Sequence, residues 1–265
     1  MTTKTNSVKR SVINIVLAVV IYFTVINLGE LLMAGTLKKM FSDSLTITMI
    51  AQIYEAIVAC VLVFVFKKRD SLKGTLKGIG EGIICGAAII AINGILPLVI
   101  KISDLVGQPI SVSKIVIASV FCIFIGISEE AIFRGIVTEY CLDIFGTKTQ
   151  KARMLSVIVP SVIFGAVHLM NAVSPDISFA TAAVQAMVAG SLGLAFGAVY
   201  YRSGRSIWAG VIIHAIVDFA GLAAKGMLTG ATASEAVGNL GLGGIILVPV
   251  YITIFLCVMR SEKTA

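Results

Sequence analysis

Charged side chains are scarce in this chain of 265 residues: Asp, Glu, Lys and Arg make up 13% of it, against 58% hydrophobic residues. A soluble domain carries about 25% charged residues. A water-soluble fold of this size could not bury so much apolar surface, and the same composition excludes disordered, collagen-like and disulfide-scaffold proteins. Together with a mean hydropathy of +1.01, it predicts an all-α, polytopic integral membrane protein.

Cysteine is also scarce: the chain has five, an odd number that cannot all pair with one another. They lie within or at the ends of apolar runs, where we expect small buried hydrophobic side chains and no disulfide framework. The net charge of +7 would be compatible with nucleic acid in a soluble protein. Here the basic residues stand between hydrophobic segments, so they indicate membrane topology and no nucleic-acid partner.

Long apolar runs predict the membrane-spanning helices, each of which needs about 20 mainly apolar residues. We expect eight spans, at residues 12–33, 45–66, 80–100, 115–136, 154–173, 181–201, 207–224 and 240–259. The first run is longer than the apolar part of a signal peptide, and no small-residue cleavage site clearly follows it. No loop is long enough for a soluble domain, so residues 1–265 form a single transmembrane domain.

The distribution of Lys and Arg supports this topology. With the N-terminus in the cytoplasm, fifteen Lys and Arg residues fall on the cytoplasmic side and five on the outer side. This bias favours eight spans with both termini in the cytoplasm, in keeping with the positive-inside rule. The basic N-terminus and short loops suggest a multi-pass protein of a bacterial plasma membrane, with the lipid bilayer as its surroundings and an oligomeric state that the sequence leaves open.

Ionisable residues inside the spans are few, and they cost several kcal/mol unless they pair, line a wet cavity or do chemistry. The set consists of Glu55, Glu129, Glu130, Arg134, His168, His214 and Asp218. Both histidines of the chain fall inside apolar helices, which favours function over two separate buried core residues. Glu55 is expected to be a hydrogen-bonded carboxyl packed against a neighbouring helix, or else to line a cavity.

The fourth span carries the sequence Glu-Glu-Ala-Ile-Phe-Arg at 129–134. Glu130 and Arg134 are four residues apart and can pair on one helix face. Glu129 lies about 100° further round the helix, so it can point elsewhere. Two adjacent carboxylates repel, and one tuned towards neutrality suits general-base work on water. The alternative is a structural Glu–Arg pair beside a Glu at the cytoplasmic edge.

Two further spans hold the histidines. His214 and Asp218 lie four residues apart, so Asp218 can orient the imidazole. Phe164 and His168 have the same spacing, and Asn171 lies three residues after His168. Glu129 and both histidines come closer to one depth if the fourth helix continues to residue 145, with a length of about 46 Å, and the fifth begins early. The site would then lie inside the membrane, about 10–17 Å from the cytosolic side.

These three segments, EEAIFR (129–134), FGAVH (164–168) and HAIVD (214–218), resemble the motifs EExxxR, FxxxH and HxxxN/D. In this order they resemble the CPBP family of intramembrane proteases, which includes type II CAAX prenyl endopeptidases and bacterial Abi-like relatives. The resemblance covers a core at about residues 115–225. It implies an eight-helix intramembrane endopeptidase that hydrolyses a peptide or a membrane-protein substrate.

The resemblance also implies roles for single residues. Glu129 would activate the hydrolytic water, with Glu130 and Arg134 supporting it, and the histidines would bind water, a metal or the oxyanion. Asp218 stands where an Asn could donate to an oxyanion; an ionised Asp cannot donate, so we expect it to orient His214 or to ligate metal.

The chemistry of the donors leaves the cofactor open. Glu129, His168 and His214 match a three-ligand catalytic zinc site, so one divalent metal is a candidate cofactor, and a glutamate–water mechanism without metal is the other. The HExxH pattern of zincins is absent.

Three other functions compete with an endopeptidase. A bacteriocin self-immunity protein acting by binding alone is the main alternative. An ion-coupled transporter could use Glu55, Glu129 and the histidines as a proton relay, but no inverted repeat is evident. A serine protease is disfavoured because Ser128 has no nucleophile turn.

Overall fold

The computed structural model describes residues 2–174, 177–232, 235–236 and 242–260, which contain helices and no strand. The longer helices are α1 (Thr2–Met40), α2 (Ser44–Val65), α3 (Leu76–Cys85), α7 (Val112–Glu129), α9 (Gln150–Val167), α10 (Phe179–Arg202), α11 (Trp208–Ala224) and α13 (Leu247–Arg260). The shorter elements are η1 (Arg69–Leu72), α4 (Ala87–Ile89), η2 (Ile90–Ile95), α5 (Leu96–Ile100), α6 (Ile102–Leu105), η3 (Glu130–Thr138), α8 (Glu139–Phe145), η4 (His168–Val173), η5 (Met227–Thr229) and η6 (Leu242–Ile246). The predicted all-α class is confirmed.

Five helical segments of the described chain are long and apolar enough to cross a membrane: Asn6–Met40, Ser44–Val65, Val112–Phe145, Gln150–Val173 and Phe179–Arg202. A sixth span results if Leu76–Cys85 and Ala87–Ile100, which meet at a bend of 52°, are counted as one. The predicted spans 207–224 and 240–259 contain shorter apolar helices, and residues 240–241 lie outside the described residues. The chain is therefore a polytopic membrane protein, while the number eight and the cytoplasmic termini stay predictions.

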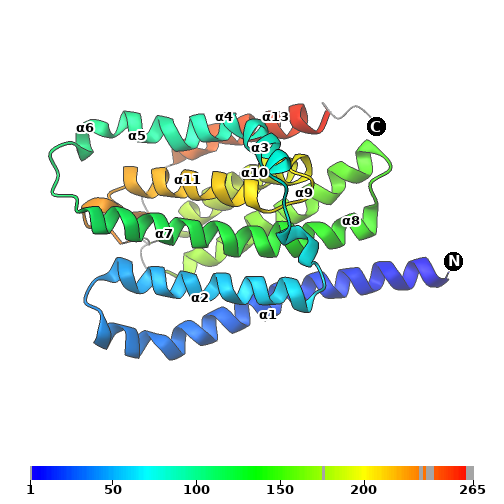
Figure 1. The fold of residues 1–265 in the computed structure, drawn as a ribbon, viewed down its shortest axis with the longest axis horizontal. Coiled ribbons are helices and arrows are strands. Elements are labelled where there is room, and N and C mark those ends of the chain that lie inside the picture. The colour runs from blue at the N-terminus through cyan, green and yellow to red at the C-terminus, as the bar shows by residue number, and fades with distance from the viewer. Residues whose placement is uncertain (1, 175–176, 233–234, 237–241, 261–265) are drawn as a thin grey trace.

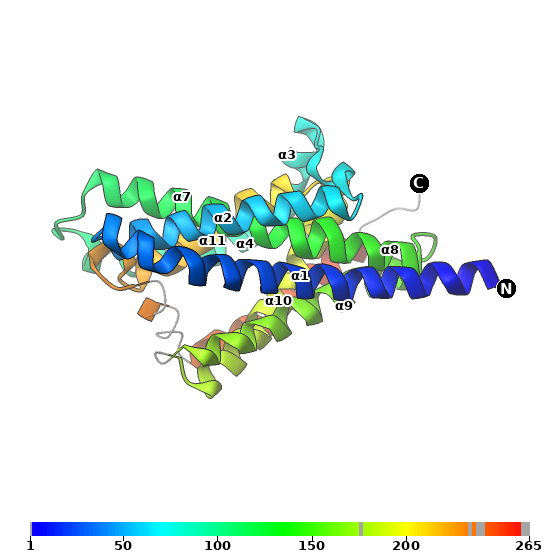
Figure 2. The same cartoon turned by 90° about the horizontal axis from the view of Figure 1, so that it is seen from below.

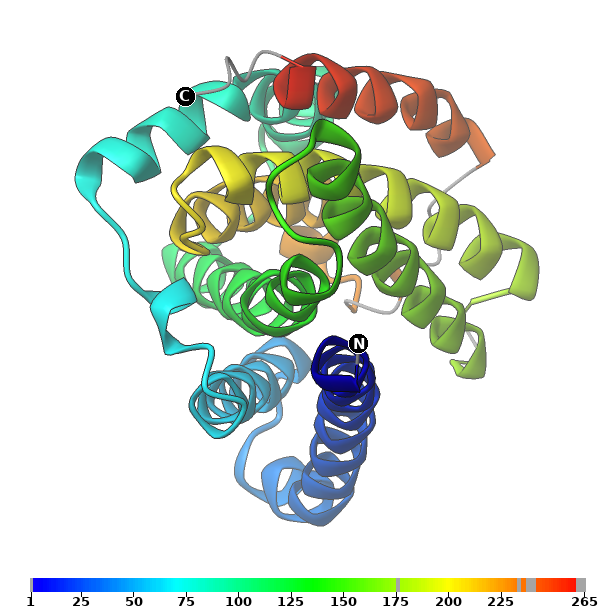
Figure 3. The same ribbon diagram turned by 90° about the vertical axis from the view of Figure 1, so that its right-hand side faces the viewer.

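The helices form an elongated bundle in which the N-terminal end of α1 and the C-terminal end of α13 lie at the same end (Figure 1). Helices α1 and α2 form a hairpin along one side, and α1 projects beyond the other helices at its N-terminal end (Figure 2). Seen end-on, α11 lies near the middle, with α7 on one side and the α3–α5 segment on the other (Figure 3). Most of the predicted site residues lie on two segments: the end of α7 with η3, and α11. Both segments are therefore in the interior of the bundle.

Short polar side chains begin five of the helices. Each accepts a hydrogen bond from the backbone amide three residues later, which satisfies one of the free N–H groups of the first turn. The capping residues are Asp43, Thr75, Ser111, Thr149 and Ser178. In the loop before α2, the hydrogen bonds from Thr46 hold the pKa of the Asp43 carboxyl below its usual value.

The segments α7, η3 and α8 form one continuous helical run, Val112–Phe145, of 34 residues. It ends at Gly146, whose φ of +82° few other residues adopt. The predicted extension of the fourth helix to residue 145 is confirmed, and so is the early start of the fifth, because α9 begins at Gln150. Within this run η3 is a π-helix, a wider turn that is frequent at functional sites.

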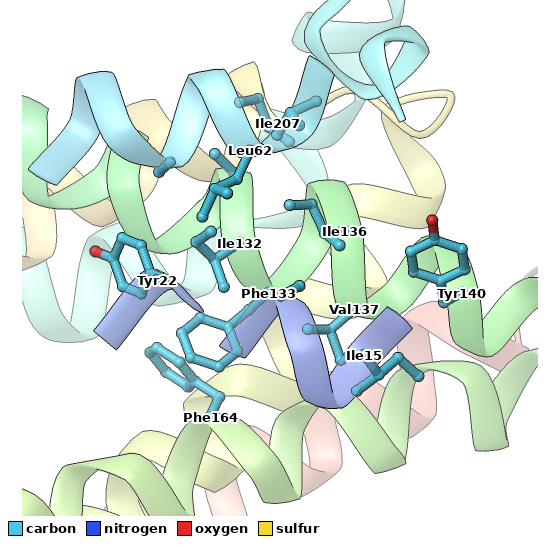
Figure 4. Packing of buried hydrophobic residues seen from close by; sticks show 14 of the residues in the cluster. Ile15, Tyr22, Leu62, Ile132, Phe133, Ile136, Val137, Tyr140, Phe164 and Ile207 are labelled. Carbon is cyan, nitrogen blue, oxygen red and sulfur yellow. The ribbon is translucent and has the colours of Figure 1, made fainter. Parts of the chain in front are cut away.

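The core is built around η3, because all nine of its residues are buried. Ile132, Phe133, Ile136 and Val137 pack with side chains of α1 and α2, as Figure 4 shows. The ring of Phe133 meets that of Phe164 on α9 edge to face, with centroids 4.9 Å apart. The charged residues of η3 are therefore fixed inside a close-packed apolar shell.

A charged cluster fixes the turn that leads into α11. The Arg205 guanidinium makes a two-pronged ion pair with Glu139 on α8, and the Tyr200 hydroxyl donates to the same carboxylate at 2.8 Å. Arg205 has a left-handed φ of +64°, so this contact holds a conformation that is unfavourable for a non-glycine residue. On the other side of the turn, the Trp208 indole donates to the Leu72 carbonyl at 2.7 Å. These contacts set where α11 begins.

Helices α9 and α10 cross at a pair of glycines, and we expect only one of the two to tolerate alanine. A Cβ at Gly165 would lie 2.6 Å from the Ala186 carbonyl oxygen and 2.9 Å from the Gly190 Cα, whereas a Cβ at Gly190 would meet nothing closer than 3.4 Å. Backbone atoms cannot turn aside, so Gly165→Ala should lower the free energy of unfolding by about 1–3 kcal/mol. Gly190→Ala is the matched control, and equal thermal midpoints for the two variants would contradict the prediction.

Candidate active site

The centre of the site is a buried ion pair in η3. The Arg134 Nη1 atom lies 3.0 Å from Oε1 of Glu130, and the exposed fractions of the two side chains are 2% and 0%. The contact is an ion pair not aligned for a hydrogen bond, whereas Arg134 Nη2 donates to the Gly193 carbonyl at 3.2 Å. The guanidinium also lies over the rings of Phe164 and Phe196. Glu130 and Arg134 therefore pair as their four-residue spacing predicts.

His214 on α11 contacts three carboxylates. Its Nδ1 atom lies 3.3 Å from Oε1 of Glu130, and its Nε2 atom lies 3.3 Å from Oε2 of Glu129 and 3.5 Å from Oδ2 of Asp218. The ring stacks on Phe196, with centroids 4.9 Å apart. The expectation that Glu129 points away from Glu130 holds only in part, because the two carboxylates meet opposite sides of the same imidazole.

The site has a closed side and an open side. Glu130 and Arg134 are sealed, whereas the side chains of Glu129 and Asp218 are 26% and 25% exposed. Oε2 of Glu130 and Oδ2 of Asp218 are buried and have no hydrogen-bond partner among the described residues. Buried polar atoms without partners are rare and call for a polar occupant such as water. The Nε2 edge of His214 thus faces a polar region that Glu129 and Asp218 border.

His168 stands at the junction between α9 and η4. Its Nδ1 atom lies 2.8 Å from the Phe164 carbonyl oxygen, and its ring meets the Phe164 ring edge to face. Phe164 also contacts His214, with centroids 6.4 Å apart. The structure therefore brings Glu129, Glu130, Arg134, His214 and Asp218 into direct contact and joins His168 to them through Phe164.

Some residues around the site were not predicted from the sequence. Phe196 supports the His214 ring, and Gly210 allows α11 to approach Glu130, because a Cβ there would lie 2.5 Å from the Glu130 Oε2 atom. Asn171 donates to Gln185 on α10 at 2.9 Å instead of contacting His168. For Gly210, the sequence offers only its spacing, four residues before His214. No spacing rule links Phe196 or Gln185 to residues on other helices.

The predicted metal ligands do not form a ligand group as they are arranged. Among the described residues, no three His, Cys, Asp or Glu side chains form a group that could hold a metal ion. In His214, Nε2 faces the carboxylates of Glu129 and Asp218, and Nδ1 faces Glu130. A metal at Glu129, His168 and His214 would need these side chains to rearrange, so this ligand set stays a prediction.

Comparison with known proteins gives one match. The family model of the Rce1-like type II CAAX prenyl endopeptidases matches residues 111–220. No curated protein matches the chain significantly. No solved structure matches it significantly either. The matched stretch contains all six predicted site residues. Residues 111–220 are therefore similar to the Rce1-like type II CAAX prenyl endopeptidases, the family that the three motifs resemble.

Proposed function

We propose that this chain is an intramembrane endopeptidase that uses Glu129 to activate water. The observation that carries the proposal is the arrangement around His214, where one carboxylate is sealed in an ion pair and another reaches the open side. Glu130 is buried and paired with Arg134. Glu129 lies outside that Glu–Arg pair and its side chain is partly accessible, which fits a group that takes a proton from water.

His214 would stabilise the charge that develops during the attack. Each of its ring nitrogens faces a carboxylate oxygen. Only the imidazolium form can donate from both nitrogens, so the surroundings favour a positively charged ring. A cation at this point, in a site largely closed to water, would attract the oxyanion formed when water adds to a peptide carbonyl. Asp218 would hold the Nε2 side of the ring and, as an ionised carboxylate, would not itself donate to the oxyanion.

His168 would play a different part. A carbonyl oxygen can only accept a hydrogen bond, so Nδ1 of His168 donates its proton to the Phe164 carbonyl. In the neutral ring Nε2 then carries a lone pair, which can accept a hydrogen bond from water. We propose that His168 binds the water that Glu129 activates.

The reaction is then a general-base hydrolysis. Glu129 takes one proton from the water as its oxygen attacks the scissile carbonyl, and it returns that proton to the amide nitrogen as the C–N bond breaks. One divalent metal, with zinc as first choice, is the alternative means of activating water, and it would require another base if Glu129 were a ligand. Metal content of the wild type beside a His168→Ala, His214→Ala variant tests this alternative.

The substrate class follows from the setting of the site. A buried site among apolar helices suits a hydrophobic peptide or the end of a membrane protein. We propose that the protein works in a bacterial plasma membrane on peptide precursors or membrane-protein tails.

Isotope labelling tests the proposed hydrolysis directly. The wild-type protein in lipid nanodiscs would be incubated in H₂¹⁸O with a library of hydrophobic peptides, and products read by mass spectrometry. We expect one ¹⁸O in each new carboxyl group. If no peptide is cleaved, and protection against a bacteriocin survives the loss of Glu129, His168 and His214, the binding-only immunity role replaces the proposal.

A further inference from the structure

A chain of polar side chains links α1 and α2 to the residue just before Glu129. The Gln52 amide nitrogen donates to the Ser128 hydroxyl at 2.9 Å and lies 3.3 Å from Oε2 of Glu55. The Tyr22 hydroxyl donates to the same Glu55 oxygen at 3.2 Å. These residues come from three helices, and only Ser128 adjoins a motif of the family. Tyr22 lies on α1 beside the apolar cluster around η3 (Figure 4).

Ser128 is the point where this chain reaches the site. It is completely buried, and its hydroxyl donates to the Ile125 carbonyl at 2.9 Å while it accepts from Gln52. Ser119, on the same helix, makes only the equivalent bond within the helix, to the Ile115 carbonyl. The contact from Gln52 therefore ties α7 to α2 at the last turn before η3.

The hydrogen-bonded network of Tyr22, Glu55, Gln52 and Ser128 is suited to fixing positions and poorly suited to moving protons. A side-chain amide donates a hydrogen bond without readily giving up its proton, and the Gln52 amide links Glu55 to Ser128. Glu30, Glu129 and the Tyr22 hydroxyl lie near enough to act electrostatically on Glu55. Because an amide interrupts the hydrogen-bonded path from Glu55 to Ser128, we favour a positioning role.

Small rotations of α7 would matter for Glu129. A side chain reaches about 5–6 Å from the helix axis, so a turn of about 20° would move a carboxylate by roughly 2 Å. The contact between Glu129 Oε2 and His214 Nε2 is 3.3 Å, and such a movement would break it. The π-helix begins directly after Glu129, so the hydrogen-bond pattern of the helix changes at the end of α7.

We propose that Gln52 and Glu55 on α2 are positioning residues: through Ser128 they hold the end of α7 in the rotation that aims Glu129 at His214. This inference rests on the proposed function only for its effect on activity. The placement of Glu129 beside His214 can be measured without any substrate.

Kinetics test the effect on activity. Gln52→Leu and Ser128→Ala should each lower kcat roughly ten- to a hundredfold with little change in KM, because a misplacement of about 1 Å can cost a hundredfold. The double variant should be no worse than the single ones, since both remove the same bond. Ser119→Ala is the matched control and should keep wild-type kcat. Glu55→Gln, which keeps an oxygen for Tyr22 and Gln52, should remain active.

Nuclear magnetic resonance of labelled histidine tests the placement itself. The chain has two histidines, so ¹⁵N-histidine labelling gives ring signals from two residues, which a His168→Asn variant assigns. In Gln52→Leu the signals of His214 should move while those of His168 stay. This result would stand even if the wild type cleaved no peptide, in which case the proposed function would fail and the positioning role would not.

Other results would overturn the inference. Unchanged His214 signals in both Gln52→Leu and Ser128→Ala would show that the hydrogen bond between Gln52 and Ser128 does not position Glu129. Additive losses of kcat in the double variant would show that the two residues act separately. A loss in Glu55→Gln as severe as in Glu129→Gln would assign Glu55 a proton-transfer role instead.

Discussion

Glu129→Gln should lower kcat for peptide hydrolysis by about 10²–10⁴-fold, because it removes a general base while keeping the size and shape of the side chain. The amide can still contact His214, so the fold should be retained and KM should change little. Initial rates measured in nanodiscs, with the thermal midpoint of each protein, check both expectations.

The control for this variant is a carboxylate of the same type away from the site. Glu81 on α3 is exposed and its ion pair with Lys77 is long, at 4.0 Å, so Glu81→Gln should keep wild-type activity. If Glu129→Gln hydrolyses peptides at the wild-type rate, Glu129 is not the base. A variant that fails to fold would be recognised by its thermal midpoint, and Glu129→Asp would then test the position with its charge retained.

Arg134→Met should produce the largest loss of stability, about 3–5 kcal/mol in the free energy of unfolding. The substitution leaves the Glu130 carboxylate buried with no cation, and the two side chains are 2% and 0% exposed in the intact pair. It also removes the guanidinium from the Gly193 carbonyl and from the rings of Phe164 and Phe196. Unfolding in detergent, followed by circular dichroism, measures the change.

A double variant separates the cost of a lone charge from the cost of lost packing. Glu130→Gln combined with Arg134→Met removes both charges, so it should recover much of the stability lost in Arg134→Met while peptide hydrolysis stays impaired. Lys73→Met is the contrasting control, because its pair with Asp70 is exposed on both sides and should have little effect on stability. If Arg134→Met had the same free energy of unfolding as the wild type, the buried pair would not be needed to hold η3.

The helical spacing explains why much of the site could be predicted. Residues four apart lie on one face of a helix, so the contacts of Glu130 with Arg134 and of His214 with Asp218 follow from the sequence. Both pairs are in contact in the structure. The length of the fourth helix was also predicted, because continuing it to residue 145 reduces the difference in depth between Glu129 and the histidines.

Spacing could not predict the contacts between helices. The placement of His214 between Glu129 and Glu130 depends on how α11 packs against the end of α7 and η3, and on Gly210, which lets the two approach. Glu55 was expected to be a hydrogen-bonded carboxyl packed against a neighbouring helix, and it does accept from Tyr22 on α1. Its connection through Gln52 to Ser128 had no signal in the sequence, because it joins residues 76 positions apart.

The scarcity of charge determined by itself that this chain is a helical membrane protein, since so much apolar surface has no other stable setting. The few charged residues left within the spans identified the candidate site, because each costs free energy that only pairing or function can offset. The tertiary structure alone decided which carboxylate is sealed and which is accessible. That choice depends on the long-range packing of α7, α11 and η3, which local spacing does not encode.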